Sequence, residues 1–212
     1  MEKTKEGKKE KMIVTDKEQL KIKSEVVSVE DGEKIALELI NELRTSGNGI
    51  GISANQIGIN KRVCVINVKD PLVLINPEIV EASEEMFAFV EGCLSFPNES
   101  VKTARHKWVK VKADNHKETL YFTILDDDSE KGYKKDQYLH YAYETACVQH
   151  EIDHLDGITM YDRELKLEPL KRKSPKIGRN TKVLIRKGEE TQTIKYKKIN
   201  KLLEDGWALV EV

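Results

Sequence analysis

Two histidines and one glutamate lie within five consecutive residues, His150-Glu151-Ile152-Asp153-His154. Residues four apart share one face of a helix, with Cβ atoms about 5–6 Å apart, so both imidazoles can bind one cation at about 2.0–2.1 Å. Glu151 follows the first histidine and can take a proton from a water molecule beside the ion and then deliver it to a leaving group. The pattern predicts a metal-dependent hydrolase.

A third protein ligand has to come from elsewhere in the chain. The acidic candidates downstream of the histidines are Asp156, Asp162, Glu164 and Glu168. Upstream stands Cys93, in a glycine-containing turn after a candidate strand, and a thiolate is a strong ligand for zinc or iron at about 2.3 Å.

The other two cysteines are interpreted as core residues. Cys147 lies seven residues before His154, roughly 10 Å along a helix, which is too far to share one ion with it easily. Cys64 lies in an apolar strand. Three cysteines without tight spacing do not form a disulfide framework, so we expect a reducing cytoplasm. The N-terminus has no secretory signal, and the longest apolar runs are too short to cross a membrane.

Several segments with helical or strand periodicity must position these residues. Residues 49–58 are rich in small side chains, which argues against a regular element there. Strands precede one long late helix, so the expected fold class is α+β, with mostly antiparallel sheets packed around the helix that carries the two histidines. The predicted helices are 32–45 and 138–155, and the predicted strands are 62–68, 72–75, 86–90, 108–113 and 119–125.

The composition changes after residue 170. The net charge of the chain is −1, but residues 171–201 contain twelve Lys and Arg against two Asp and Glu. This segment is predicted to form a basic linker followed by a small β/α appendage. Its expected elements are strands 182–186 and 192–196, a helix at 198–204 and a last strand at 207–212.

Three segments together resemble the signature motifs of peptide deformylases. They are GIGISANQ at residues 49–56, EGCLS at residues 91–95 and QHEIDH at residues 149–154, in the order and spacing of that family. The resemblance extends from about residue 12 to residue 163. It implies a catalytic domain at 12–170. The Lys- and Glu-rich residues 1–11 are predicted to be a disordered extension, and the change of composition predicts a separate basic module at 171–212.

The resemblance implies a reaction and roles for the residues. Cys93, His150 and His154 would bind the metal, and Glu151 would be the acid and base. The backbone N–H of Leu94 and the side-chain amide of Gln56 would form the oxyanion hole. The substrate would be the N-formyl-methionine end of nascent polypeptides, and formate would be released. Ferrous iron is the usual ion in this family, and zinc or nickel often substitutes.

Further residues are assigned by the same resemblance. Those expected to contact the peptide are Ile50, Gly51, Glu91, Gly92, Tyr143 and Ala146. For the last two, which would line a methionine pocket, ordinary core packing is the alternative. Arg105 and Asp153 are expected to form an ion pair that stabilises the helix carrying the two histidines. The alternative is that both are ordinary charged residues on the surface.

The chain also departs from the family pattern. Ser53 stands where the first motif usually has alanine, and the charged loop at 126–137 is longer than is typical. The basic module replaces the usual C-terminal helix. It could dock on ribosomal RNA, because clustered cations attract phosphates, or simply be a solubilising tail. Rival interpretations of the whole chain are a metallopeptidase that shares only the histidine motif, and an inactive RNA-binding relative.

Overall fold

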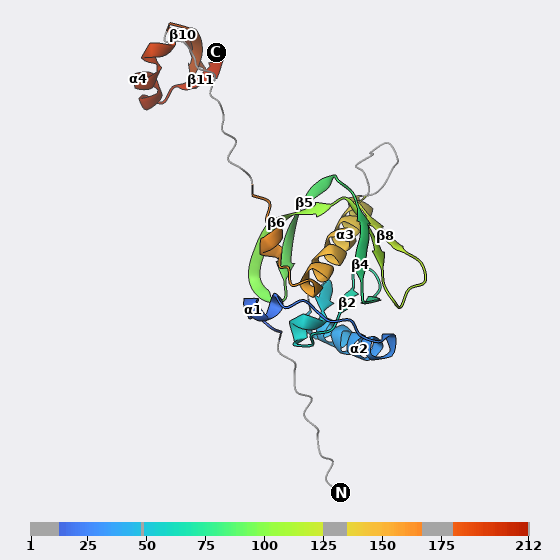
Figure 1. Cartoon of the computed structure of the whole chain (residues 1–212). Coiled ribbons are helices and arrows are strands. Elements are labelled where there is room, and N and C mark those ends of the chain that lie inside the picture. The colour runs from blue at the N-terminus through green and yellow to red at the C-terminus, as the bar shows by residue number, and fades with distance from the viewer. Residues whose placement is uncertain (1–12, 48, 125–134, 167–179, 212) are drawn as a thin grey trace. The chain divides into compact units, whose positions relative to one another are not determined.

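The computed structural model describes residues 13–47, 49–124, 135–166 and 180–211. The chain divides into two compact units between Leu165 and Lys166 (Figure 1). The extension predicted at 1–11 and most of the predicted basic linker lie outside the described residues, as does the loop at 126–134. No helix in the described ranges is both long and apolar enough to span a bilayer.

The first unit combines helices with short antiparallel strands, which confirms the expected α+β class. Its α-helices are α1 (Lys17–Leu20), α2 (Val29–Ser46) and α3 (Lys135–Leu155), and its 3-10 helices are η1 (Ala54–Ile57) and η3 (Met160–Arg163). Its strands are β1 (Gly51–Ser53), β2 (Val63–Ile66), β3 (Leu72–Ile75), β4 (Glu78–Ala82), β5 (Met86–Cys93), β6 (Phe96–His106), β7 (Trp108–Lys112) and β8 (Leu120–Thr123).

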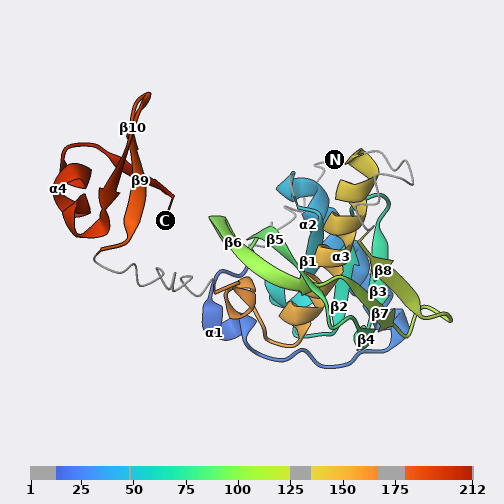
Figure 2. The same ribbon diagram turned by 90° about the horizontal axis from the view of Figure 1, so that it is seen from above.

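The strands form three antiparallel sheets, ordered β1-β2-β3, β4-β7-β8 and β5-β6. Figures 1 and 2 show α3 running through the middle of the unit among these sheets. Val148, Ile152 and Leu155 of α3 pack with apolar side chains of β2, β3, β7 and β8 in one buried cluster. The helix that carries the histidine motif is therefore the central element of the first unit.

The second helix covers another part of the core. Ala36, Leu39 and Leu43 recur at helical spacing on α2 and pack against β1, β2 and β3 in a second buried cluster. Ser28 caps the start of α2 by accepting a hydrogen bond from the Asp31 N–H at 3.2 Å. This packing fixes the position of β1, which lies next to α3.

The structure corrects three expectations. Residues 49–58 were expected to be irregular, but they contain strand β1 and helix η1, because β1 pairs with β2 from Gly51 to Ser53. Helix α3 begins at Lys135, so residues 135–137 are helical and do not belong to the charged loop. Strands β4 and β6 were not predicted, because their polar side chains hide the alternation that marks a strand.

The second unit is a small sheet covered by a helix. Its strand order is β10-β9-β11, from β10 (Glu190–Lys195), β9 (Lys182–Lys187) and β11 (Ala208–Glu211). Helix η4 (Tyr196–Lys198) leads into α4 (Ile199–Glu204), and Ile199 packs with Val183 and Ile185. These elements lie within a few residues of their predicted positions, because the strands alternate and Gly188 forms the hairpin turn.

The turn that follows helix α3 contains a position, Gly157, that only glycine can occupy without strain. Gly157 has φ +74°, and a Cβ there would overlap the backbone oxygen of Lys21. We expect Gly157→Ala to lower the free energy of unfolding by about 2–4 kcal/mol, measured by urea denaturation. Gly58→Ala is the control, since Gly58 has φ +77° with nothing within 4 Å, and it should cost about 1 kcal/mol. Equal losses in the two variants would contradict the overlap.

Candidate metal centre and active site

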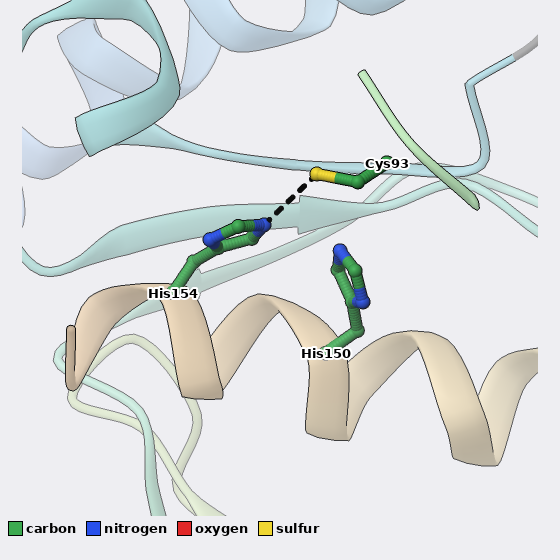
Figure 3. A group of neighbouring side chains, drawn as sticks. All are labelled: Cys93, His150 and His154. Carbon is green, nitrogen blue, oxygen red and sulfur yellow. Dashed lines mark hydrogen bonds between the residues drawn. The ribbon is translucent and has the colours of Figure 1, made fainter. Parts of the chain in front are cut away.

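Cys93, His150 and His154 lie together although they come from two distant parts of the chain (Figure 3). Their candidate ligand atoms lie within 4.8 Å of one another, and Cys93 Sγ is 3.2 Å from His154 Nε2. Both imidazoles stand on α3 and point toward the end of β5, where Cys93 lies. The third ligand left open by the sequence is therefore the cysteine.

This donor set fits a divalent metal ion. A tetrahedral ion with bonds of about 2.0–2.3 Å separates its ligand atoms by about 3.3–3.6 Å. The 3.2 Å between Cys93 Sγ and His154 Nε2 is close to this value, and all three ligand atoms lie within 4.8 Å of one another. The ring of His150 uses Nδ1 to contact Glu91 Oε2 at 2.9 Å, so Nε2 is left for an ion. His154 presents Nε2 to the cysteine, while its buried Nδ1 has no hydrogen-bond partner. Two oriented imidazoles and one thiolate are typical of a zinc or iron site.

The acidic alternatives have other partners. Asp156 accepts a hydrogen bond from Arg62 Nη1 at 2.7 Å, and Asp162 accepts one from the Thr159 N–H at 2.8 Å. Only the backbone of Glu164 is paired, in an isolated β-bridge with Thr103, and its carboxylate is not part of the cluster. Glu168 lies outside the described residues. Among the residues that the structure describes, no acidic side chain joins the three-residue cluster.

The carboxylate of Glu91 connects the β5–β6 hairpin to helix α3, which carries both histidines. Arg105 donates from Nε to Glu91 Oε1 at 2.6 Å and from Nη2 to Oε2 at 2.8 Å, and Thr103 Oγ1 donates to Oε1 at 2.7 Å. Burial by itself would raise the pKa of Glu91, but the hydrogen bonds from Arg105 and His150 lower it to about 2. Glu91 was predicted to contact substrate; in the structure its carboxylate contacts His150 Nδ1 and orients that ring.

The expected pair of Arg105 and Asp153 is present and buried. Arg105 Nη1 donates to Asp153 Oδ2 in a very short contact, and the side chains are 3% and 8% exposed. Asp153 directly precedes His154, so the pair links β6 to the end of the histidine motif. The alternative of plain surface charge is excluded by this burial.

Glu151 faces the same space from α3 and is buried. Ser53 Oγ lies 2.6 Å from Glu151 Oε2 and 2.9 Å from the Glu151 backbone oxygen. Burial raises the pKa of Glu151, opposed by His150 and by the hydrogen bond from Ser53. A carboxyl group with a raised pKa can both accept and return a proton near neutral pH. The serine in place of the usual alanine thus contacts the expected acid and base directly, which the sequence did not indicate.

The side-chain amide of Gln56 points toward the turn between β5 and β6. Its Oε1 accepts a hydrogen bond from the Ser53 N–H at 2.9 Å, so the amide Nε2 is directed outward. This Nε2 lies 3.4 Å from Cys93 Sγ and 3.2 Å from Ser95 Oγ. Leu94 lies between Cys93 and Ser95 in the sequence and lines a cavity beside the cysteine and the two histidines. Both expected oxyanion-hole donors therefore lie beside the cysteine.

A cavity of about 530 Å³ opens beside these groups. All six residues expected to contact substrate line it, as does Phe89, whose ring meets the Tyr143 ring edge to face at 5.2 Å between centroids. Tyr143 is 44% exposed and Ala146 is buried. The wall formed by Phe89, Tyr143 and Ala146 is apolar, as a methionine side chain requires.

Cys147 and Cys64 are buried, as expected of core residues. Burial raises the pKa of both thiols. Cys147 also lines the cavity and lies 3.3 Å from the backbone oxygen of Ile50. Its position behind β1 makes it part of the wall around Glu151.

Sequence reasoning missed four residues of this site: Ser53, Phe89, Ser95 and Thr103. Alternation along β5 places Phe89 on the same side as Glu91, so that pattern could have found it. Ser95 is the last residue of the EGCLS motif at residues 91–95, so the motif could have drawn attention to it. Ser53 stood out in the sequence only as a departure from the motif, and Thr103 gave no signal. Their partners, Glu151 and Glu91, lie 98 and 12 residues away.

The arrangement defines a class of protein: a metal-dependent hydrolase with two helix histidines, one cysteine and an adjacent glutamate. Comparison with known proteins agrees. The sequence profile of the family described as Polypeptide deformylase matches residues 9–173. The chain belongs to this family, whose members are metal-dependent enzymes that remove the formyl group from N-formyl-methionine.

Individual relatives share most of their length with this chain. The peptide deformylase of Finegoldia magna is 35% identical over 146 residues, which is 68% of this chain and 81% of that protein. The peptide deformylase of Desulforudis audaxviator is 38% identical over 133 residues, covering 62% and 76%. The crystal structure of peptide deformylase from Thermotoga maritima has a TM-score of 0.59 at 30% identity, covering 73% and 96%. The expected family, fold class and enzyme class are confirmed.

Gly51 leaves room for the carboxylate of Glu151. A Cβ at this position would overlap Cys147 Sγ and lie 2.5 Å from Glu151 Oε1. We expect Gly51→Ala to displace Glu151 and lower kcat by about 100-fold, with one bound metal ion retained. Deformylase assays and metal analysis measure the two effects.

A second variant distinguishes the effect of the clash with the Cys147 thiol from the effect of displacing the Glu151 carboxylate. Cys147→Ala alone should keep its activity, and Gly51→Ala combined with Cys147→Ala should stay as slow as Gly51→Ala. Recovery of activity in the double variant would show that the thiol, and not Glu151, causes the loss.

Proposed function

We propose that this chain removes the formyl group from the N-terminal formyl-methionine of nascent polypeptides through the residues described above. The observation that carries the proposal is the position of Glu151, buried next to the Cys93, His150 and His154 cluster and on the wall of a cavity. Bound at the cluster, a divalent ion supplies Lewis acidity, which makes water a nucleophile near neutral pH.

Glu151 moves the proton in this scheme. Ser53 Oγ donates a hydrogen bond to one carboxylate oxygen of Glu151, Oε2, at 2.6 Å. The other oxygen, Oε1, lies beside Gly51. We assign Oε1 as the atom that accepts the proton from water and returns it to the nitrogen of the departing amine. The buried setting of the carboxyl group favours both steps, because it brings the pKa closer to neutral.

Gln56 and Leu94 stabilise the charge that develops on the formyl oxygen. The Gln56 amide is held by Ser53, so it needs no reorientation during the reaction. The Leu94 N–H is proposed as the second donor. A preorganised donor of this kind contributes roughly 3–4 kcal/mol to lowering the barrier.

The peptide is proposed to bind along β1. This strand is at the edge of the β1-β2-β3 sheet, and Ile50 and Gly51 line the cavity. The Ile50 carbonyl already accepts a hydrogen bond from the Asn67 N–H at 2.7 Å, so strand-like bonds to substrate come from other backbone atoms of this edge. Gly92 offers backbone on the opposite side of the cavity. The methionine side chain would contact Phe89, Tyr143 and Ala146, where its sulfur can meet aromatic ring edges.

We propose ferrous iron as the physiological ion, with zinc or nickel able to substitute. One thiolate and two imidazoles suit all three ions, and the softness of the thiolate disfavours magnesium and calcium. We also propose a cytoplasmic location. The three cysteines are free, and the proposed substrate is produced where ribosomes translate.

The proposed activity predicts a simple comparison. Formate should be released from a formyl-methionyl tripeptide, and the unformylated tripeptide should not be cleaved. Glu151→Gln should lower kcat by about 10²–10⁴-fold, because the amide cannot accept the proton, while one metal ion per chain is retained. Formate release, peptide products and metal content are measured on the same anaerobically purified samples.

Glu33→Gln, an exposed change of the same chemistry on α2, is the control and should have full activity. Cleavage of the unformylated peptide would favour the rival metallopeptidase. A Glu151→Gln variant with more than a tenth of the parent's kcat would exclude Glu151 as the acid and base.

We further propose that the C-terminal module docks the enzyme on ribosomal RNA. Helix α4 covers the face of the small sheet that carries Val183 and Ile185. The opposite face exposes Lys182, Arg186 and Lys195. Lys182 and Lys195 are direct cross-strand partners, and like charges in such pairs are destabilising unless an anion lies against them. A phosphate backbone supplies that anion.

A charge-matched pair of variants tests the docking. We expect Lys182→Gln, Arg186→Gln and Lys195→Gln together to reduce co-sedimentation with ribosomes, and to lower the slope of log K against log salt by about 2. As the charge-matched control, Lys197→Gln and Lys198→Gln in η4 together with Lys201→Gln in α4, all at exposed lysines, should have less effect. Deformylase activity on a free tripeptide should not change in either. Unaltered co-sedimentation after removal of residues 171–212 would leave the solubilising tail as the explanation.

A further inference from the structure

An ionic chain leads from the metal centre to the last turn of the catalytic unit. Arg163 Nη2 donates to Asp153 Oδ1 at 2.7 Å, and Arg163 Nε donates to Asp153 Oδ2 at 3.0 Å. Asp153 also contacts Arg105, which holds Glu91, which contacts His150. Arg163 is thus the outer end of a chain of alternating charges whose inner end is a ring proposed to bind the metal.

The charges in this chain balance only if Arg163 is included. Glu91 and Asp153 are both buried carboxylates, and the single buried cation between them is Arg105. His150 has to be neutral to bind a metal ion, so it supplies no compensating charge. Buried carboxylates are costly unless each is paired. Arg163 provides the fourth charge, and its planar fork contacts both oxygens of Asp153.

The backbone around Arg163 is fixed on both sides. It belongs to helix η3, whose N-cap residue Thr159 forms a capping box with Asp162. Two residues later, the Leu165 N–H donates to the Lys102 oxygen at 2.8 Å, and Glu164 bridges to Thr103 of β6. This turn lies beside β6 in Figure 1. Because Thr103 also binds Glu91, Arg163 and Glu91 are attached to the same stretch of strand.

We propose that Arg163 is a positioning residue of the metal centre, acting through Asp153, Arg105 and Glu91 on the ring of His150. Without Arg163, Asp153 has only Arg105 as a cationic partner among the described residues. Arg105 is then drawn toward Asp153, and its two hydrogen bonds to Glu91 weaken. Glu91 consequently holds His150 Nδ1 less firmly, and His150 binds a metal ion less tightly. The proposal rests on the metal centre assigned above.

The test measures metal binding by the full chain in the absence of substrate. Zinc affinity is determined by competition with a chelator, and the cobalt form is examined for its visible absorption, well below the melting temperature of each variant. Arg163→Gln should raise the Kd for zinc by about 10–100-fold and alter the cobalt spectrum. Arg163→Lys, which keeps the charge but not the fork, should give an intermediate Kd. On the zinc-saturated enzyme, kcat should fall while KM stays within about twofold of the parent.

Arg44→Gln is the control, since Arg44 is an exposed arginine in the last turn of α2 and its replacement changes the charge equally. Its zinc affinity should equal that of the parent. A double-mutant cycle with Asp153→Asn identifies the route: Arg163→Gln should add little once Asp153 is neutral.

Two results would overturn the proposal. One is a zinc Kd of Arg163→Gln within twofold of the parent, with an unchanged cobalt spectrum. The other is full additivity of Arg163→Gln and Asp153→Asn. Because zinc binding is measured without a peptide, a failure of the proposed deformylase reaction would leave this result unaffected, and the two proposals can fail separately.

Discussion

The contact between Glu91 and His150 holds the two halves of the site together. One half is the face of α3 that carries both histidines, and the other is the β5–β6 hairpin that carries Cys93. Glu91 lies two residues before Cys93, and its carboxylate reaches His150 Nδ1 at 2.9 Å while Arg105 and Thr103 hold it from β6. A hairpin displaced along α3 would break the contact of Glu91 with His150 and that of Arg105 with Asp153, although Glu91 and Arg105 would stay paired within the hairpin. The cost of losing these buried polar contacts favours one register of the hairpin on the helix.

The same constraint explains the polar character of the hairpin. A strand in an ordinary core alternates apolar and polar side chains, whereas β6 places Thr103 and Arg105 on its buried face. These residues bury polar groups because each has a specific acceptor on Glu91 or Asp153. The hydrophobic clusters that flank α3 supply the stability, and the ionic chain supplies the geometry of the site.

The surroundings of Glu151 show how close packing sets chemical roles. Gly51 and Cys147 limit the space on one side of the carboxylate, and Ser53 binds one of its oxygens. Strand β1 can approach α3 this closely only because glycine has no side chain. The carboxylate therefore has Oε2 hydrogen-bonded to Ser53 and Oε1 beside Gly51, and its residue lines the cavity. The sheet and the helix, and not the motif alone, decide which oxygen is free.

Much of this protein was determined by local sequence. The helices α2 and α3, the strands β2, β3, β7 and β8 and the elements of the basic module were all predictable. In α2 the apolar residues recur at helical spacing, residues 138–155 contain no glycine or proline, and β2 and β3 are short apolar runs. The two histidines and Glu151 were predictable because spacing along one helix fixes their relative positions. The third ligand was left open among several acids and Cys93, and only the motif resemblance favoured the cysteine.

Ser53, Thr103 and Arg163 were not predictable, and neither was the role of Glu91 in orienting His150. Each of these contacts joins residues between 10 and 98 positions apart. The tertiary structure alone decided them, because a buried polar side chain is satisfied by whichever partner the packing of helices and sheets brings within hydrogen-bond distance.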